Sequence, residues 1–252
     1  MSDDAAHSDD YTAPPPITDL DLPPSYSLPE TDADDILPPA SLHIDGCLIR
    51  SSDPSAPPLY QTSHAIVGLS EVSRQTSLER LDPVVRTQAG GAPQVTSRPK
   101  SLYHLKHYPA LWLPKFPYFA EPVSRQTYGT IGLVAFHPKK LSTAKGYRVH
   151  RAAKGKDRVL IAKEVILTAS PGKDAVMFEW VDGQDRLVAR EVKEADNRIH
   201  LVITAEMGRK MRDMLVVAWM LRIWWELAEA SIRPTSWEDV KRKWNTRYNN
   251  NS

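Results

Sequence analysis

The sequence predicts a mainly β protein in which an antiparallel β-barrel, or a strongly curved sheet, wraps around a C-terminal apolar α-helix. Short apolar runs separated by turn residues fill the middle of the chain, and one twelve-residue run near the C-terminus is apolar on every side. The first 55 residues are rich in acids and prolines instead. The expected organisation is a disordered acidic arm over 1–55, a barrel with a central helix over 56–230 and a polar tail over 231–252.

The expected arm differs from the rest of the chain in charge. Residues 1–58 hold twelve acidic residues and one basic residue, Arg50, a net charge of −11, and the remainder carries +12, which together make the formal +1. Low hydrophobicity with high net charge cannot offset the entropy lost on folding. The N-terminus, MSDDAAHSDD, lacks the apolar stretch of a secretory signal, and a single cysteine, Cys47, allows no intrachain disulfide. We therefore expect a cytoplasmic protein, free or peripheral at membranes.

Nine or ten strands are expected between Tyr60 and Ala205. Ile199, Leu201 and Ile203 alternate with more polar residues, which is the pattern of a half-buried strand. Asp182-Gly183 lies between two apolar runs and predicts a hairpin with a type I′ turn. Gly129 and Gly132 interrupt an apolar run and predict a bulge or bend. The stretches 87–100 and 137–146 are expected to be loops.

The apolar run from Met214 to Trp225 predicts a buried helix over about 211–229. Crossing a membrane takes about 20 apolar residues, whereas this run has twelve positions, contains Arg222 and has charged flanks, so we expect no transmembrane segment. It also lacks the polar stripe of a surface helix. Strands closing around such a helix would bury it and leave no exposed edges. In the polar tail, Ser236 could cap a second, short helix.

This order of elements resembles the tubby C-terminal-like superfamily, which includes tubby, the phospholipid scramblases and the plant LURP-one-related proteins. FEWVDGQDRLVAREV is similar to that group's penultimate hairpin, and RIHLVITAEMGRKMRDMLVVAWMLRIWWEL to its last strand and buried helix. PPLYQTSHAIVGLSEVSRQTSLERL resembles the opening of uncharacterised fungal proteins with this helix. The resemblance covers roughly 57–230. It implies twelve strands around the helix and, because tubby binds phosphoinositides, a lipid-binding role at the level of the fold.

No catalytic site and no cofactor are expected, because the sequence contains no nucleophile elbow, phosphate loop or zinc-protease motif. His104 and His107 are three positions apart in an expected strand, so they should face opposite sides. No cysteine or acidic cluster completes a metal site with them, and we expect no metal. Cys47 has no matched histidine and asparagine that would make it a nucleophile.

A cluster of basic residues follows position 138 and has two interpretations. It is either a solvated hairpin face or a site for the headgroups of anionic lipids, where each cation near the surface contributes ~1 kcal/mol. Nucleic acid is not an expected partner, because the overall charge is balanced and no recognition motif is present. The candidate anionic-lipid-binding residues are Lys139, Lys140, Lys145, Arg148, Arg151, Lys154, Lys156 and Arg158.

Two PPxY motifs are present, Pro23-Pro24-Ser25-Tyr26 in the arm and Pro57-Pro58-Leu59-Tyr60 where the first expected strand begins. WW domains bind PPxY because its prolines already favour the polyproline II conformation. We expect WW-domain proteins, chiefly HECT-type ubiquitin ligases, as partners. The arm copy should bind, whereas Tyr60 should have mainly a structural role. The function expected overall is that of a non-enzymatic adaptor, with a scramblase-like or lipid-handling protein, or a structural domain without a ligand, as alternatives.

Overall fold

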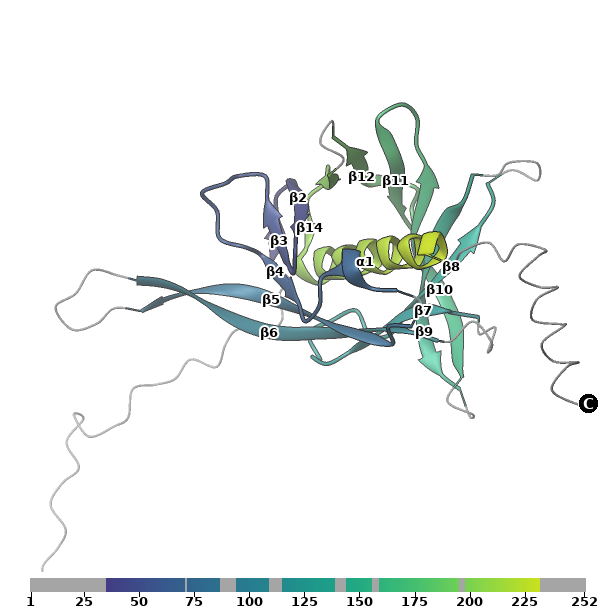
Figure 1. Ribbon diagram of the computed structural model, residues 1–252, viewed down its shortest axis with the longest axis horizontal. Coiled ribbons are helices and arrows are strands. Elements are labelled where there is room, and N and C mark those ends of the chain that lie inside the picture. Colours follow the sequence, from purple (N-terminus) through teal and green to yellow (C-terminus); the bar gives the residue numbers. More distant parts are fainter. Residues whose placement is uncertain are drawn as a thin grey trace, which may run out of the picture. The chain divides into compact units, whose positions relative to one another are not determined.

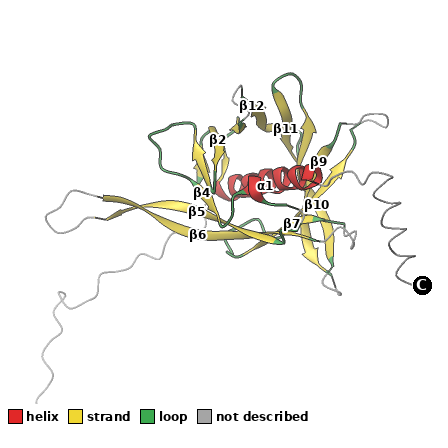
Figure 2. Cartoon of the chain, viewed as in Figure 1, coloured by secondary structure: helices red, strands yellow, loops and turns green. Residues whose placement is uncertain are grey.

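The computed structural model describes residues 35–70, 72–86, 94–108, 115–138, 144–155, 159–194 and 198–231. Within these ranges, twelve antiparallel strands close into a barrel around one long α-helix (Figure 1). Figure 2 shows the helix in red, with strands on its different sides. The mainly β architecture with a C-terminal helix is confirmed, and the barrel is closed with twelve strands rather than the nine or ten expected from the sequence.

Each barrel strand pairs with the strand that precedes or follows it in the chain, except where the barrel closes. There β13 pairs with β2, and Leu201 lies opposite Leu42. The barrel strands are β2 (Ala40–Asp45), β3 (Leu48–Ser51), β4 (Tyr60–Thr62), β5 (Gln75–Arg86), β6 (Gln94–His107), β7 (Tyr118–Pro122), β8 (Ile131–Phe136), β9 (Gly146–Lys154), β10 (Leu160–Pro171), β11 (Val176–Asp182), β12 (Leu187–Lys193) and β13 (Ile199–Ile203).

Three shorter elements complete the described fold. Strands β1 (Ile36–Leu37) and β14 (Met207–Gly208) form a separate two-stranded sheet just before the helix. A short 3-10 helix, η2 (Ile66–Gly68), lies between β4 and β5 and contacts the central helix. Ile66 is fully buried there, so this connection contributes to the core.

The central helix, α1 (Arg209–Ser231), is surrounded by protein along most of its length. Every residue from Arg212 to Trp224 is buried, which confirms the expectation of a helix that is apolar all round and lies inside the fold. Neither glycine nor proline interrupts it. The described residues contain no helix with the length and hydropathy needed to cross a membrane.

The prediction that the arm extends to residue 55 is wrong for its last part. Residues 36–51 contribute β1, β2 and β3, and Leu42 and Ile49 are almost fully buried in the core. These apolar residues lie among prolines and acids, which masked them in the sequence. Leu42 on β2 lies opposite the distant strand β13, and Ile49 on β3 lies opposite β4 across the intervening loop. Residues 1–34 and 232–252, including the helix expected at Ser236, lie outside the described residues.

Three local predictions also need correction. The β11–β12 hairpin exists, but its positive φ falls at Asp185 rather than at Asp182-Gly183, so the turn is wider than type I′. Gly129 does have a positive φ, of 86°, whereas Gly132 sits in regular β8 pairing against Phe119. The loop expected over 87–100 is too long, because β6 already begins at Gln94.

Candidate functional site

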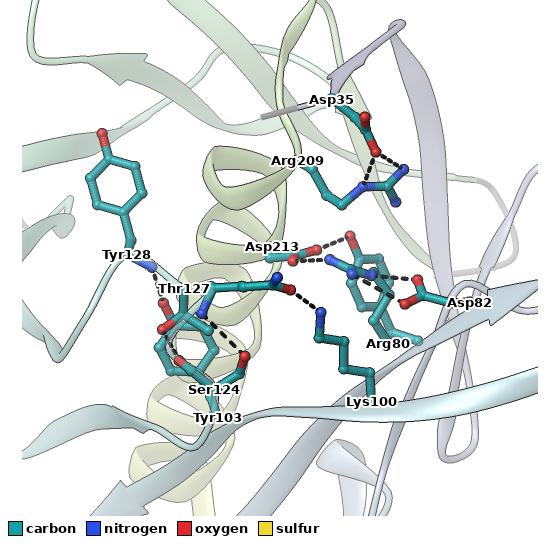
Figure 3. Close-up of polar contacts among 12 residues, drawn as sticks. Asp35, Arg80, Asp82, Lys100, Tyr103, Ser124, Thr127, Tyr128, Arg209 and Asp213 are labelled. Atoms are coloured by element: carbon teal, nitrogen blue, oxygen red, sulfur yellow. Dashed lines mark hydrogen bonds and ion pairs between the residues drawn. The ribbon is translucent and has the colours of Figure 1, made fainter. Parts of the chain in front are cut away.

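The second PPxY motif leads into the core of the barrel. Tyr60 lies on β4, is only 2% exposed and donates a hydrogen bond of 2.9 Å from its hydroxyl to Oδ1 of Asp213 on α1. Arg80 on β5 donates to the other carboxylate oxygen, Oδ2, at 2.5 Å, and binds Asp82 at 2.6 Å. Figure 3 shows the Arg80 guanidinium between the carboxylates of Asp213 and Asp82. The phenol of Tyr60 therefore links the wall of the barrel to its central helix.

Burial sets the protonation chemistry of this cluster. Desolvation, followed by the neighbouring charge of Asp213, raises the pKa of the Tyr60 phenol well above its usual value, so the phenol stays neutral and donates. Desolvation also raises the pKa of the Asp213 carboxyl, and the charge of Arg80 and the Tyr60 hydrogen bond oppose that rise. An aspartate next to a guanidinium and a neutral phenol is a stable buried arrangement.

These contacts remove the second PPxY copy, Pro57-Pro58-Leu59-Tyr60, from the surface that a WW domain can reach. Pro57 is exposed, but Pro58 and Leu59 are half-buried. The backbone N–H of Leu59 donates a hydrogen bond to the Ile49 carbonyl, and the Leu59 carbonyl accepts one from the Leu81 N–H. A WW domain needs the tyrosine ring in its own pocket, so the WW-binding assignment of this copy does not hold in the folded barrel. The first copy, Pro23, Pro24 and Tyr26, lies outside the described residues.

The basic residues that the structure describes do not form one unpaired cationic face. Of the eight candidates, Lys139, Lys140, Lys156 and Arg158 lie outside the described residues. Each of the four others has a partner. These contacts are Lys145 Nζ with Glu229 Oε2 at 2.6 Å, Arg151 with Glu164 at 3.4 Å, Lys154 with Glu121 at 3.0 Å, and the Arg148 guanidinium 4.4 Å from the centre of the Phe136 ring.

Acids from other parts of the chain thus neutralise part of this cluster. Residues 139–163 contain a single acid, Asp157. In the fold, however, Glu121 on β7 contacts Lys154, and Glu229 on α1 contacts Lys145. Lys145 also lies 4.8 Å from the ring centre of Trp225, so it takes part in packing at the C-terminal half of the helix. The local field of the described part of the cluster is therefore weaker than the lysine and arginine count indicates.

Sequence reasoning missed two exposed apolar side chains in the same hairpin. Val159 is 57% exposed and Ile161 is 51% exposed. Both lie where β9 turns into β10, and the Gly155 N–H donates to the Val159 carbonyl across that turn. The sequence shows only an uninterrupted apolar run at Val159, Leu160 and Ile161. Which side of the strand faced outward, however, depended on the register with β9.

A second polar cluster lies deeper, around the arginine that interrupts the apolar run. Arg222 and Glu191 are both fully buried and form an ion pair, and Glu191 also accepts a hydrogen bond of 2.8 Å from the Trp180 indole. Arg222 further binds Glu226 at 2.6 Å, and Tyr147 donates to the same glutamate at 3.2 Å. Desolvation raises the pKa of Glu191, and the charge of Arg222 opposes this. All these contacts are internal, so the cluster joins α1 to β9, β11 and β12.

The histidines and the cysteine show no metal-binding arrangement. His107 is buried and stacks on Tyr118 with ring centres 4.4 Å apart, whereas His104 is 3.3 Å from Gln75 Nε2. Over the described ranges, no group of three histidine, cysteine, aspartate or glutamate side chains has the geometry to hold a metal ion. Cys47 is exposed in the turn between β2 and β3.

Comparison of the chain with protein-family models, with curated proteins and with solved structures gave no match.

Proposed function

We propose that this chain is a non-enzymatic adaptor that recruits WW-domain proteins through Pro23, Pro24 and Tyr26, with HECT-type ubiquitin ligases as the partner class. The observation that supports the proposal is the burial of Tyr60, which gives the second PPxY copy a structural role and leaves the first copy as the one that we propose to bind. One copy is built into the barrel wall, and the other precedes the first described strand, Ile36–Leu37. In this proposal the binding motif precedes the folded barrel in the sequence, and the barrel is the folded domain of the adaptor.

The physical basis of recognition is the same for any WW domain. Proline residues already populate the extended polyproline II conformation, so little entropy is lost on binding, and an aromatic groove holds the rings while a separate pocket holds the tyrosine. A single contact of this kind has an affinity in the roughly micromolar range, about −8 kcal/mol. Simultaneous use of both copies would raise the avidity only if residues 57–60 left the barrel.

A binding experiment with the full chain and an array of WW domains tests this proposal. Pro23→Ala/Pro24→Ala and Tyr26→Ala should each abolish binding. The matched control is Pro57→Ala/Pro58→Ala, which destroys the second motif but leaves the buried Tyr60 ring in place, and it should bind like the parent. Loss of binding in the control with retention in Tyr26→Ala would reverse the two roles. Retention in all variants would mean that both motifs arose by chance.

A second candidate function is attachment to anionic membrane surfaces through the β9–β10 hairpin. What favours it is the exposure of Val159 and Ile161 near Lys154, in a segment whose sequence also contains Lys156 and Arg158. Apolar side chains can enter the headgroup region while the cations attract acidic lipids, at ~1 kcal/mol each. The resemblance to the tubby-like group points the same way, although the pairing of Lys154 with Glu121 reduces the charge available.

Liposome binding separates the two components of this second function. Val159→Ser/Ile161→Ser and Lys154→Glu/Lys156→Glu/Arg158→Glu should each weaken binding of the full chain to phosphatidylserine or phosphoinositide vesicles at physiological salt. A charge-matched control, Arg50→Glu/Arg98→Glu/Arg190→Glu, changes three cations on other strands and should bind like the parent. Failure of the parent chain to bind either vesicle, or equal losses in the control, would end the idea.

A further inference from the structure

A cavity of about 570 Å³ lies where the central helix begins. Met207 on β14 and Met211 in the first turn of α1 contribute to its lining, and the β11–β12 turn and part of β10 provide further walls. Val165 on β10 is 39% exposed, although it is apolar. Ligand pockets for small organic molecules have volumes of about 300–1,000 Å³, so the size of this cavity suits such a ligand.

The apolar part of the lining is adaptable. Ile166, Val188 and Met207 are buried, and Met211 is partly buried against the core. Methionine side chains have three rotatable bonds and a polarizable sulfur, so they can fit around an apolar body of variable shape. This lining would bury the apolar part of a ligand without requiring one particular outline.

The charged part of the lining is negative. It contains Glu164, Asp182 and Glu206 against a single cation, Arg186, which leaves three negative charges and one positive, or −2. The guanidinium of Arg186 is already bound to Asp182, with Nε 2.8 Å from Oδ2. Asp182 Oδ1 accepts from the Gln184 and Arg186 backbones. The Asp182–Arg186 pair is thus satisfied within its own hairpin and has little capacity left for a ligand.

The two glutamates carry the remaining charge. Glu164 has one long contact, 3.4 Å to Arg151, and the two side chains are 62% and 54% exposed. Exposed pairs of this kind contribute little, so the contact can give way to a better one. Glu206 is exposed at the edge of the cavity. Carboxylates at the rim of an apolar cavity attract a cation and repel an anion.

Tyr128 adds an aromatic surface to the lining. Its backbone N–H donates to the Tyr103 hydroxyl at 3.0 Å, which holds this part of the β7–β8 connection against β6. In Figure 3 the Tyr128 ring points away from that contact and from the cluster around Asp213. Tyr128 lines the same cavity as Glu164 and Glu206, and aromatic faces attract ammonium groups through cation–π interactions.

We propose that this cavity binds a monovalent organic cation with an apolar body, such as an aliphatic or aromatic amine in its ammonium form. The ammonium group lies at the rim beside Glu164, Glu206 and the ring of Tyr128, and the apolar body lies over Met207 and Met211. The cavity lining shares no residue with the WW-binding motif or with the β9–β10 turn, so amine binding can be tested separately from the proposed function.

The full chain labelled with ¹³C at its methionine methyl groups provides a direct test. The chain has six methionines, and Met207→Leu and Met211→Leu assign the two signals from the cavity. Titration with hexylammonium should shift these two signals saturably and leave the others nearly unchanged. Hexanol should bind about tenfold more weakly and hexanoate more weakly still, because they share the six-carbon body but lack the positive charge.

Variants identify the charged groups. Glu164→Gln/Glu206→Gln should reduce hexylammonium binding about tenfold, to the level of hexanol, without affecting hexanol itself. The control, Glu179→Gln/Glu194→Gln, changes two carboxylates outside the lining and should bind like the parent. Tyr128→Leu should weaken hexylammonium more than hexanol. Equal binding of hexylammonium and hexanol, tighter binding of hexanoate, uniform shifts of all methionines, or no effect of the double glutamate variant would each overturn the proposal.

Discussion

The Tyr60 hydroxyl donates a hydrogen bond of 2.9 Å to Asp213 across a sequence separation of 153 residues. This hydrogen bond joins β4, an early strand of the barrel, to α1, the central helix that follows the last barrel strand in the chain. Arg80 binds the same carboxylate from the next strand, so one buried acid connects β4, β5 and α1 (Figure 3). The motif that looks like a ligand in the sequence is, at this position, part of the scaffold.

The first prediction concerns this hydrogen bond. Tyr60→Phe keeps the ring but leaves a buried oxygen of Asp213 without its donor, which should lower the free energy of unfolding by about 1–3 kcal/mol. Urea unfolding followed by tryptophan fluorescence would measure it. Tyr26→Phe, the equivalent change in the arm motif, should leave the free energy of unfolding unchanged. Equal stability of Tyr60→Phe and the parent would show that the phenol is not held as described.

A second prediction concerns the fully buried pair Arg222 and Glu191. Arg222→Met should cost about 3–5 kcal/mol, because Glu191 is left charged and unpaired in the core. The loss should shrink as the pH falls, since protonation of Glu191 removes that charge. Adding Glu191→Gln should recover part of the stability. Arg190→Met, which breaks an exposed pair with Glu179, is the control and should cost under about 1 kcal/mol. Simple additivity in the double variant would argue against direct pairing.

The third prediction concerns the glycine in β8. A Cβ atom on Gly132 would lie 2.4 Å from ring atoms of Phe116, a side chain that is only 1% exposed. Gly132→Ala should therefore force the ring aside and cost about 1–3 kcal/mol. Phe116→Leu should restore part of this loss when combined with it. Thermal unfolding of both variants would show this, and Gly68→Ala, which meets no atom within 4 Å, should change stability much less.

The fourth prediction concerns pH and the seam where β2 meets β13. His43 and His200 lie directly opposite each other there, with ring centres 5.5 Å apart. Burial, followed by His200, Arg198 and Arg50, lowers the pKa of His43, while Asp45 opposes this. As the pH falls, His43 therefore becomes protonated at a higher pH in the unfolded chain than in the folded chain. This contribution to stability is fully present above the ordinary histidine pKa of about 6.5 and is lost as the pH falls below it.

The measurement for the seam is the difference between the parent and His43→Gln. The parent should lose more stability than the variant between about pH 7 and pH 5, because the variant lacks the titrating ring. Working with the difference removes the contributions of the carboxylates, which both proteins share. A steeper loss in His43→Gln than in the parent would contradict the assignment.

The elements that could be predicted are those with a clear hydrophobic pattern within a short segment of the sequence. The alternation of Ile199, Leu201 and Ile203 marks β13, and the all-round apolar run before Trp225 marks a buried helix. Strands β2 and β3 escaped prediction because Leu42 and Ile49 lie in an acidic, proline-rich stretch. They fold through pairing with segments that are far away or interrupted by a loop.

The candidate sites show the same division. The two PPxY motifs and the basic residues can be identified in the sequence, but their burial and their contact partners cannot. Whether Lys154 is free depends on Glu121, which only the β6–β7–β8–β9 arrangement brings within 3.0 Å. In the sequence, Asp213 is only the residue before the apolar run, whereas in the fold it is the acceptor for both Tyr60 and Arg80. Contacts of this kind depend on how strands from different parts of the chain align and on how the barrel closes, and the pattern of a single strand does not determine either.

We propose that only the first PPxY copy, Pro23-Pro24-Ser25-Tyr26, can bind a WW domain while the barrel is folded. The number of WW domains bound per folded chain, measured by calorimetric titration of the full protein with an isolated WW domain, tests it most directly. We expect one WW domain per chain, and none after Tyr26→Ala. Two per chain, or one that persists after Tyr26→Ala and disappears after Pro57→Ala/Pro58→Ala, would contradict it.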